Sequence, residues 1–145
     1  SEAAASGVGD AITQFVHLAM LDLAGIGTAM TQREALRERI KQHVTEHLGD
    51  PALSVDGIAH ALNCSRRHLY NAFAEEPDGV AGYILRRRLE ACRQAFDHRA
   101  SDHRSITAIA FSNGFSNMPH FSRVFRSHLG LAPSDYRRVA GGLAT

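Results

Sequence analysis

The chain has 145 residues, 44% of them hydrophobic, which is enough for the core of one domain, with or without a short appendage. Its net charge of +1 argues weakly against a nucleic-acid partner, but residues 1–53 carry −3 and residues 54–145 carry +4. The chain has only two cysteines, no apolar run of about 18 residues and no leader pattern, so we expect a cytoplasmic protein without a disulfide scaffold or a membrane partner.

Residues 1–30 are predicted to be a flexible N-terminus followed by a junction helix. Apolar residues from Ile12 to Leu23 recur at helical spacing after Asp10, and Gly25 to Gly27 should end the helix. This helix either packs on the rest of the chain as an extra helix, or belongs to a junction with a further domain or to a dimer contact. The sequence favours neither alternative.

A second helix is predicted from Thr31 to Leu48, with its apolar residues four apart, and Gly49-Asp-Pro51 should end it. It contains His43-Val-Thr-Glu46-His47, a spacing also found in zinc peptidases. That chemistry needs a third ligand and a water-holding cleft, and the two histidines equally fit a solvated helix face. We therefore expect no metal, no cofactor and no enzyme activity.

Residues 54–74 predict a first helix-turn-helix unit. Ser54 should cap a helix over 55–62, and Ser65 should cap a second helix over 66–74. Ile58, Leu69 and Phe73 lie on the predicted buried side. The outward residues of the second helix are Arg66, Arg67, Tyr70 and Asn71.

A linker helix is predicted over about 79–97, with Asp78 as a candidate cap. Its apolar stripe is Leu85, Leu89, Cys92 and Phe96. Three consecutive arginines, Arg86, Arg87 and Arg88, point to different faces of such a helix and cannot share one role.

Residues 105–129 predict a second helix-turn-helix unit. Ser105 should cap its first helix, Gly114 should supply a turn with positive φ, and Ser116 should cap the second helix, whose first turn accommodates Pro119. Phe121, Val124 and Phe125 should face inward. The outward set is Asn117, Met118, His120, Ser122 and Arg123.

After this unit, Gly130 should close the helix, and Pro133 should begin a short final helix with Tyr136 buried. Residues 141–145 are predicted to be a tail, which leaves residues 31–140 as the main domain.

The two units form an internal repeat. Ile58 and Ile109 are 51 residues apart, as are Ser65 and Ser116. The second copy then gains one residue, so that Leu69 corresponds to Phe121. An all-α fold follows, with two helix-turn-helix units on one linker helix.

These motifs resemble the DNA-binding domain of the AraC/XylS family of bacterial transcription regulators over about Arg37 to Arg138. The resemblance rests on Ile58-Ala59, Ser65 to Phe73, Arg86 to Leu89, Ile109-Ala110, Gly114-Phe-Ser116, Phe121 to Phe125 and Gly130 to Arg137. Asn71 and Ala132 depart from the residues usual in the family. The resemblance implies a tandem, homeodomain-like fold and a structural Arg88 that holds the units together through a buried ion pair. It implies double-stranded DNA as partner, with RNA polymerase and a second copy as further candidates, and a sensor domain elsewhere in the full-length protein.

We therefore predict a sequence-specific DNA-binding transcription regulator that inserts two recognition helices into adjacent major-groove segments. The outward residues named for each unit are the candidates for reading bases, because Arg and Asn can pair with guanine and adenine edges. The candidates for phosphate contact are Ser54, Ser65, Ser105, Ser116, Arg86, Arg87 and Arg126. The alternative is a helical protein-interaction module without DNA binding, in which the same residues form a partner surface.

Overall fold

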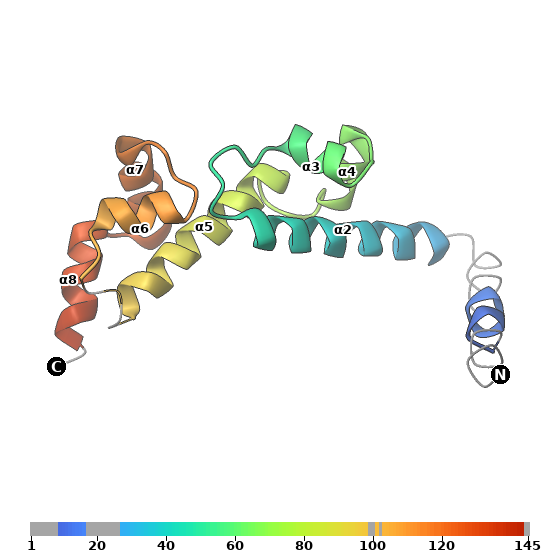
Figure 1. Cartoon of the computed structure of the whole chain (residues 1–145), viewed down its shortest axis with the longest axis horizontal. Coiled ribbons are helices and arrows are strands. Elements are labelled where there is room, and N and C mark those ends of the chain that lie inside the picture. The colour runs from blue at the N-terminus through green and yellow to red at the C-terminus, as the bar shows by residue number, and fades with distance from the viewer. Residues whose placement is uncertain (1–8, 17–26, 99–100, 102, 144–145) are drawn as a thin grey trace.

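The computed structural model describes residues 9–16, 27–98, 101 and 103–143, which contain helices and no strand (Figure 1). After a helix at residues 9–16, the elements are α2 (Gly27–His47), α3 (Val55–Ala61), α4 (Arg66–Ala72), α5 (Gly79–Asp97), α6 (Ile106–Ser112), α7 (Met118–Leu129) and α8 (Pro133–Leu143). The all-α prediction is confirmed. No helix in these ranges combines the length and the apolarity needed to cross a membrane.

Residues 9–16 are exposed along the whole described part of the predicted junction helix. Ile12, Phe15 and Val16 leave 58%, 72% and 50% of their surface open. The remainder of that prediction, residues 17–26, lies outside the described residues. The described part is therefore not covered by the rest of the chain.

Two hydrophobic cores form, and α5 contributes to both. Val80 and Ile84, in the first half of α5, join the core of α2, α3 and α4. Leu89, Cys92 and Phe96, in the second half, join the core of α6 and α7. The predicted stripe on this helix is confirmed, and a continuous helix makes the two units one body.

The helices of the first unit begin and end close to the predicted positions. Ile40 and Val44 of α2 are fully buried, and α2 begins at Gly27, earlier than the predicted Thr31. The Ser54 hydroxyl accepts the Gly57 amide, and the Ser65 hydroxyl accepts the His68 amide. Both predicted caps are confirmed.

The turns of the two units have the same backbone form, 51 residues apart. Asn63 has φ 52° and Gly114 has φ 93°, both in the left-handed region. The next residue in each turn donates its amide to the first helix of the unit, Cys64 to the Ala59 carbonyl at 3.0 Å and Phe115 to the Ala110 carbonyl at 3.1 Å. Positive φ at Gly114 is therefore confirmed.

The predicted cap of α7 was wrong by one residue. Asn117 is the cap, and its Oδ1 accepts the His120 amide at 2.9 Å. The additional residue of the second repeat, Ser116, lies between Phe115 and this cap. From the cap onward the units are offset by 52 residues, as Asn117 follows Ser65 by that number. Pro119 lies in the first turn of α7, as expected.

Three smaller predictions at helix ends also differ from the structure. Asp78 precedes α5 in a left-handed conformation, φ 61°, and its side chain makes no capping bond. Tyr136 is half-buried, because its hydroxyl reaches out to Asp97 Oδ1 at 3.0 Å while its ring packs on Phe125. The last helix continues through Leu143, into the range predicted as a tail.

Arg88 joins the two units, but not through the ion pair that the resemblance implies. Its Nε donates to the Leu48 carbonyl at 3.1 Å and its Nη2 to the Asp50 carbonyl at 2.7 Å. These carbonyls follow the end of α2, where helices leave acceptors unpaired. Burial lowers the pKa of Arg88, while the Asp50 charge acts in the opposite direction.

The turn of the second unit lies directly against this arginine. A Cβ added to Gly114 would meet Arg88 Nε at 2.4 Å and the Leu48 carbonyl oxygen at 2.5 Å. Similarly, a Cβ on Gly49 would meet the Ser112 carbonyl oxygen at 2.7 Å. The end of α2, Arg88 and the second turn thus form one close-packed junction that fixes the two units relative to each other.

Candidate nucleic-acid interface

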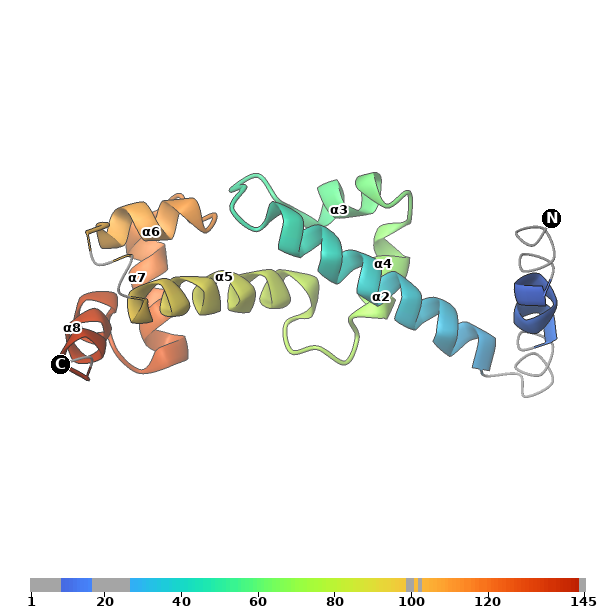
Figure 2. The ribbon, with the colours of Figure 1, turned by 60° about the horizontal axis from the view of Figure 1, so that its bottom comes forward.

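The two candidate recognition helices, α4 and α7, lie on one side of the molecule. Figure 1 shows both helix-turn-helix units above the layer formed by α2 and α5, and in Figure 2, where the bottom has come forward, α4 and α7 lie behind that layer. The connecting helix α5 has 19 residues and is thus ~28 Å long at the standard rise. That length is close to the ~34 Å that separates successive major-groove segments on one face of DNA.

The exposed side of α4 contains two kinds of side chain. Arg66 is exposed but paired with neighbouring side chains. Its Nε lies 3.0 Å from Asp56 Oδ1, and its Nη2 donates to the Tyr70 hydroxyl at 3.2 Å. The hydrogen bond to Tyr70 and the charge of Asp56 raise the pKa of Arg66. Arg67 and Asn71 are exposed, and their side chains make no hydrogen bond or ion pair with the described residues. These two are the side chains free to meet a partner.

The exposed side of α7 carries a shallow groove lined by Ser122, Arg123 and Arg126. Arg123 makes no hydrogen bond or ion pair within the described part of the chain. His120 is exposed, with its ring 6.4 Å from that of Phe115. This groove places two unneutralised guanidinium groups one helical turn apart.

Two residues of the predicted base-reading set, Asn117 and Met118, have other roles in the structure. The side-chain oxygen of Asn117 is occupied in capping α7. Met118, the first residue after the cap, is half-buried because it packs against the core of the second unit rather than pointing outward. Of the predicted base-reading set of this unit, His120, Ser122 and Arg123 are the residues that are exposed and not used in capping α7.

His68 was missing from the sequence prediction. It is exposed, and with the offset of 52 residues it takes the position in α4 that His120 takes in α7. The same offset places Asn71 and Arg123 at equivalent positions. The sequence could have revealed His68 through the helix caps. Aligning the cap Ser65 with the cap Asn117, rather than with Ser116, pairs His68 with His120.

The residues predicted to contact phosphate divide into three groups. The hydroxyls of Ser54, Ser65 and Ser105 each accept an amide of their own helix at 3.0–3.1 Å. Ser116 is exposed but does not cap a helix, and Arg126 is exposed in the last turn of α7. Arg86 and Arg87 form the third group.

The guanidinium groups of Arg86 and Arg87 bind other parts of the protein. Arg86 bonds to Glu76 Oε2 at 3.1 Å and to the Pro77 carbonyl at 2.9 Å. Arg87 donates to the Tyr83 hydroxyl at 2.9 Å and to Thr45 Oγ1 at 3.2 Å. Both are half-buried, which differs from the exposed position that the prediction requires.

The two histidines of α2 lie against each other on one face of the helix. The rings of His43 and His47 stack with centroids 4.2 Å apart, and His47 Nδ1 bonds to the His43 carbonyl at 2.9 Å. Burial, with a further contribution from His47, lowers the pKa of His43. Among the residues that the structure describes, no three His, Cys, Asp or Glu side chains lie close enough to hold a metal.

Comparisons with known proteins agree with this geometry. A family model described as a helix-turn-helix domain matches residues 58–139. The chain is 33% identical over 101 residues to the transcriptional activator RhrA of Rhizobium meliloti, covering 70% of this chain and 32% of that protein. It is 34% identical over 102 residues to the XylDLEGF operon transcriptional activator of Pseudomonas putida, with the same coverage. The chain thus spans about a third of the length of these relatives.

Solved structures show the same fold. An AraC-type transcriptional regulator from Chromobacterium violaceum shares 26% identity at a TM-score of 0.63, over 78% of this chain and 96% of that one. The C-terminal domain of the response regulator AraT from Geobacillus stearothermophilus shares 23% identity at a TM-score of 0.65, over 72% of this chain and 84% of that one. The chain therefore belongs to the helix-turn-helix DNA-binding domains of the AraC/XylS-type bacterial transcription regulators.

Proposed function

We propose that this chain reads a specific DNA sequence by inserting α4 and α7 into two successive major-groove segments. The observation that supports this most directly is the pair of equivalent helices on one side of the molecule, neither of which contains an acidic residue. DNA carries about one negative charge per 1.7 Å of its axis, so acid-free helices are suited to entering its grooves.

The base-reading roles follow from the side chains that are exposed and unpartnered. Arg67 and Arg123 each have the planar fork that pairs with O6 and N7 of guanine, and Asn71 can pair with N6 and N7 of adenine. Tyr70, His120 and Ser122 complete the two surfaces. Arg66 is a weaker candidate, because a base contact would have to replace its bonds to Asp56 and Tyr70.

For phosphate contact, Arg126 is the stronger candidate among the predicted residues, since it is exposed beside Arg123. The amides at the capped starts of α3, α4 and α6 are weaker candidates, because one amide of each helix is already bound by its serine. Such contacts fix the register of the protein on DNA without reading sequence.

We also propose that the chain regulates transcription in the bacterial cytoplasm as part of a longer protein with a separate sensor domain. Its relatives are named transcriptional activators and are about three times as long as the matched region. Contacts with RNA polymerase and with a second copy of the protein belong to this proposal.

The test compares Arg123→Ala with its neighbour Arg126→Ala on a cognate duplex and on a random duplex. Arg123→Ala should lose about 1–3 kcal/mol at the cognate site and little on random DNA, because it removes a base contact. Arg126→Ala should weaken binding to both duplexes alike, because it removes a phosphate contact. Arg67→Ala should behave as Arg123→Ala does.

Equal weakening by Arg123→Ala on both duplexes would contradict the base-reading role. No DNA binding by the unmodified chain, together with a stable complex with a protein partner, would favour the interaction module instead.

A further inference from the structure

A second groove lies beside the first recognition helix, between α4 and α2. Its floor is partly apolar, and its polar lining residues are Gln32, Arg33 and Arg39 of α2, Asn63 of the turn, and His68 and Asn71 of α4. None of its lining residues is acidic. Because Asn71 and His68 belong to both the recognition helix and this groove, whatever DNA contacts α4 also approaches the groove.

The basic residues of α2 divide into two sets. Arg37 forms an ion pair with Glu76 and lies 5.5 Å from the centre of the Phe73 ring. Lys41 lies 5.9 Å from the centre of the Tyr83 ring and 3.9 Å from Glu38. These two side chains stabilise the packing of the first unit.

Arg33 and Arg39 form the other set, on the groove. Within the described part of the chain neither forms an ion pair, and Arg39 makes one long hydrogen bond, from Nη2 to the Leu62 carbonyl at 3.4 Å. Both charges are therefore available to an anion. An exposed arginine without a carboxylate partner has no ion pair to break before it binds an anion, whereas Arg37 would first have to leave Glu76.

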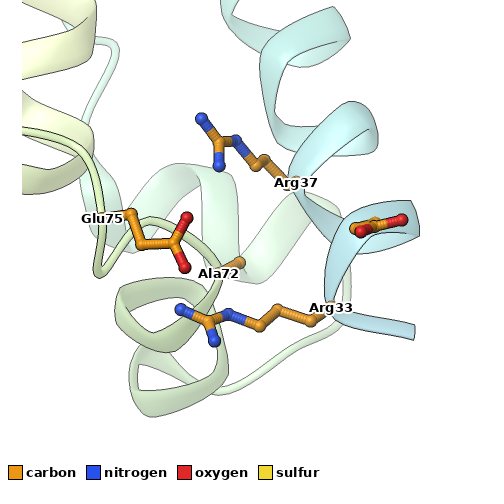
Figure 3. A pocket seen from close by; sticks show the side chains of 5 residues that line it. Arg33, Arg37, Ala72 and Glu75 are labelled. Carbon is orange, nitrogen blue, oxygen red and sulfur yellow. The ribbon is translucent and has the colours of Figure 1, made fainter. Parts of the chain in front are cut away.

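Two carboxylates, Glu34 and Glu75, line a small pocket with Arg33. This pocket lies next to the groove, Arg37 and Ala72 complete it, and Figure 3 shows the Arg33 side chain pointing toward Glu75. Arg33 forms no ion pair with either carboxylate in the described structure. Arg33 thus lies at the boundary of the two pockets and Arg39 lies in the groove itself.

We propose that this groove holds the phosphate backbone of one DNA strand, with Arg39 and Arg33 each neutralising one phosphate. The inference rests on the proposed function, since it requires α4 to lie in the major groove. The major groove of DNA is about 12 Å wide, and a helix with its side chains is about 10–12 Å across. The two flanks of α4 must therefore face the DNA strands at the edges of the major groove. The flank bearing His68 faces α2, and there Arg33 and Arg39 are the cationic groups.

The experiment measures the affinity of the whole chain for a cognate and a random duplex at several salt concentrations. The unmodified chain is compared with Arg39→Ala, Arg33→Ala and the double variant. Loss of two phosphate contacts should lower the slope of log K against log salt by ~1.8, so that raising salt from about 50 to 200 mM weakens the unmodified chain ~12-fold more than the double variant. The ratio of cognate to random affinity should stay unchanged.

Two further variants separate charge from structure. Arg39→Lys keeps the charge and loses the bond to Leu62, so it should keep most of the salt slope. Lys41→Ala removes a charge from the same helix on the side facing Tyr83, so it should leave the slope unchanged.

Failure of the unmodified chain to bind DNA would overturn the proposed function and the inference together. Normal specific binding with an unaltered salt slope in the double variant would overturn the inference alone. A double variant that loses only discrimination would also overturn it, because the arginines would then contact bases. A fall in slope caused equally by Lys41→Ala would show that total charge, rather than this groove, sets the salt dependence.

Discussion

Gly114→Ala should destabilise the chain much more than Gly130→Ala, although both glycines have a left-handed backbone. Gly114 has φ 93° and Gly130 has φ 82°. A side chain in this region costs about 1–2 kcal/mol at either position. At Gly130 a new Cβ meets nothing within 4 Å, so this conformational strain is the whole expected loss.

At Gly114 the new methyl group also enters the junction between the units. It would lie 2.5 Å from the Leu48 carbonyl oxygen, a backbone atom, and 2.4 Å from Arg88 Nε. Relieving such overlap costs about 1–3 kcal/mol and also displaces Arg88 from the carbonyls that it binds. The total should reach about 2–5 kcal/mol.

The assay is urea unfolding of the whole chain, with the free energy extrapolated to water and the m-value compared among variants. Gly49→Ala serves as a second control, because its Cβ would meet the Ser112 carbonyl oxygen at 2.7 Å without a positive φ. It should lose about 1–3 kcal/mol from crowding alone. Equal losses in Gly114→Ala and Gly130→Ala would refute the close-packed junction.

Three other outcomes follow from the structure. Asn117→Ala should cost about 1 kcal/mol in the same urea assay, whereas Ser116→Ala should change the free energy of unfolding by less than about 0.5 kcal/mol; the reverse order would restore Ser116 as the cap. Cys92 is fully buried, and burial raises the pKa of its thiol to about 12, so iodoacetamide at pH 8 should modify Cys64 of the folded chain first, as mass spectrometry would show. Equal labelling of both thiols without denaturant would contradict this. Phe125→Ala should cost about 3–5 kcal/mol, because a fully buried ring leaves a cavity, and a loss below about 1 kcal/mol would show that the core of the second unit is not packed as described.

Local patterns in the sequence were sufficient to predict most helices and the core. Helical spacing places Ile40, Val44 and Phe125 in the core, and small polar residues before apolar runs identify the caps at Ser54 and Ser105. These predictions depend on neighbours within a few residues, which the sequence displays directly.

Errors arose where the outcome depends on distant parts of the chain or on a choice between adjacent residues. Ser116 and Asn117 are both good caps, so cap preference alone does not choose between them. Apart from Tyr83, which lies one turn from Arg87, the partners of the three consecutive arginines of α5 lie in the loop before α5 or near the end of α2, so spacing alone cannot assign them. The same reason explains why the groove between α2 and α4 was not predicted.

The most direct test of the central claim is selection of binding sites from a randomised duplex pool, followed by sequencing and by affinity measurements on the enriched site. Two recognition helices on one rigid body predict an asymmetric motif with two elements about 10 base pairs apart, read by a single chain. An enriched motif with only one element, or binding without any enriched motif and with a steep salt slope, would contradict the two-helix reader.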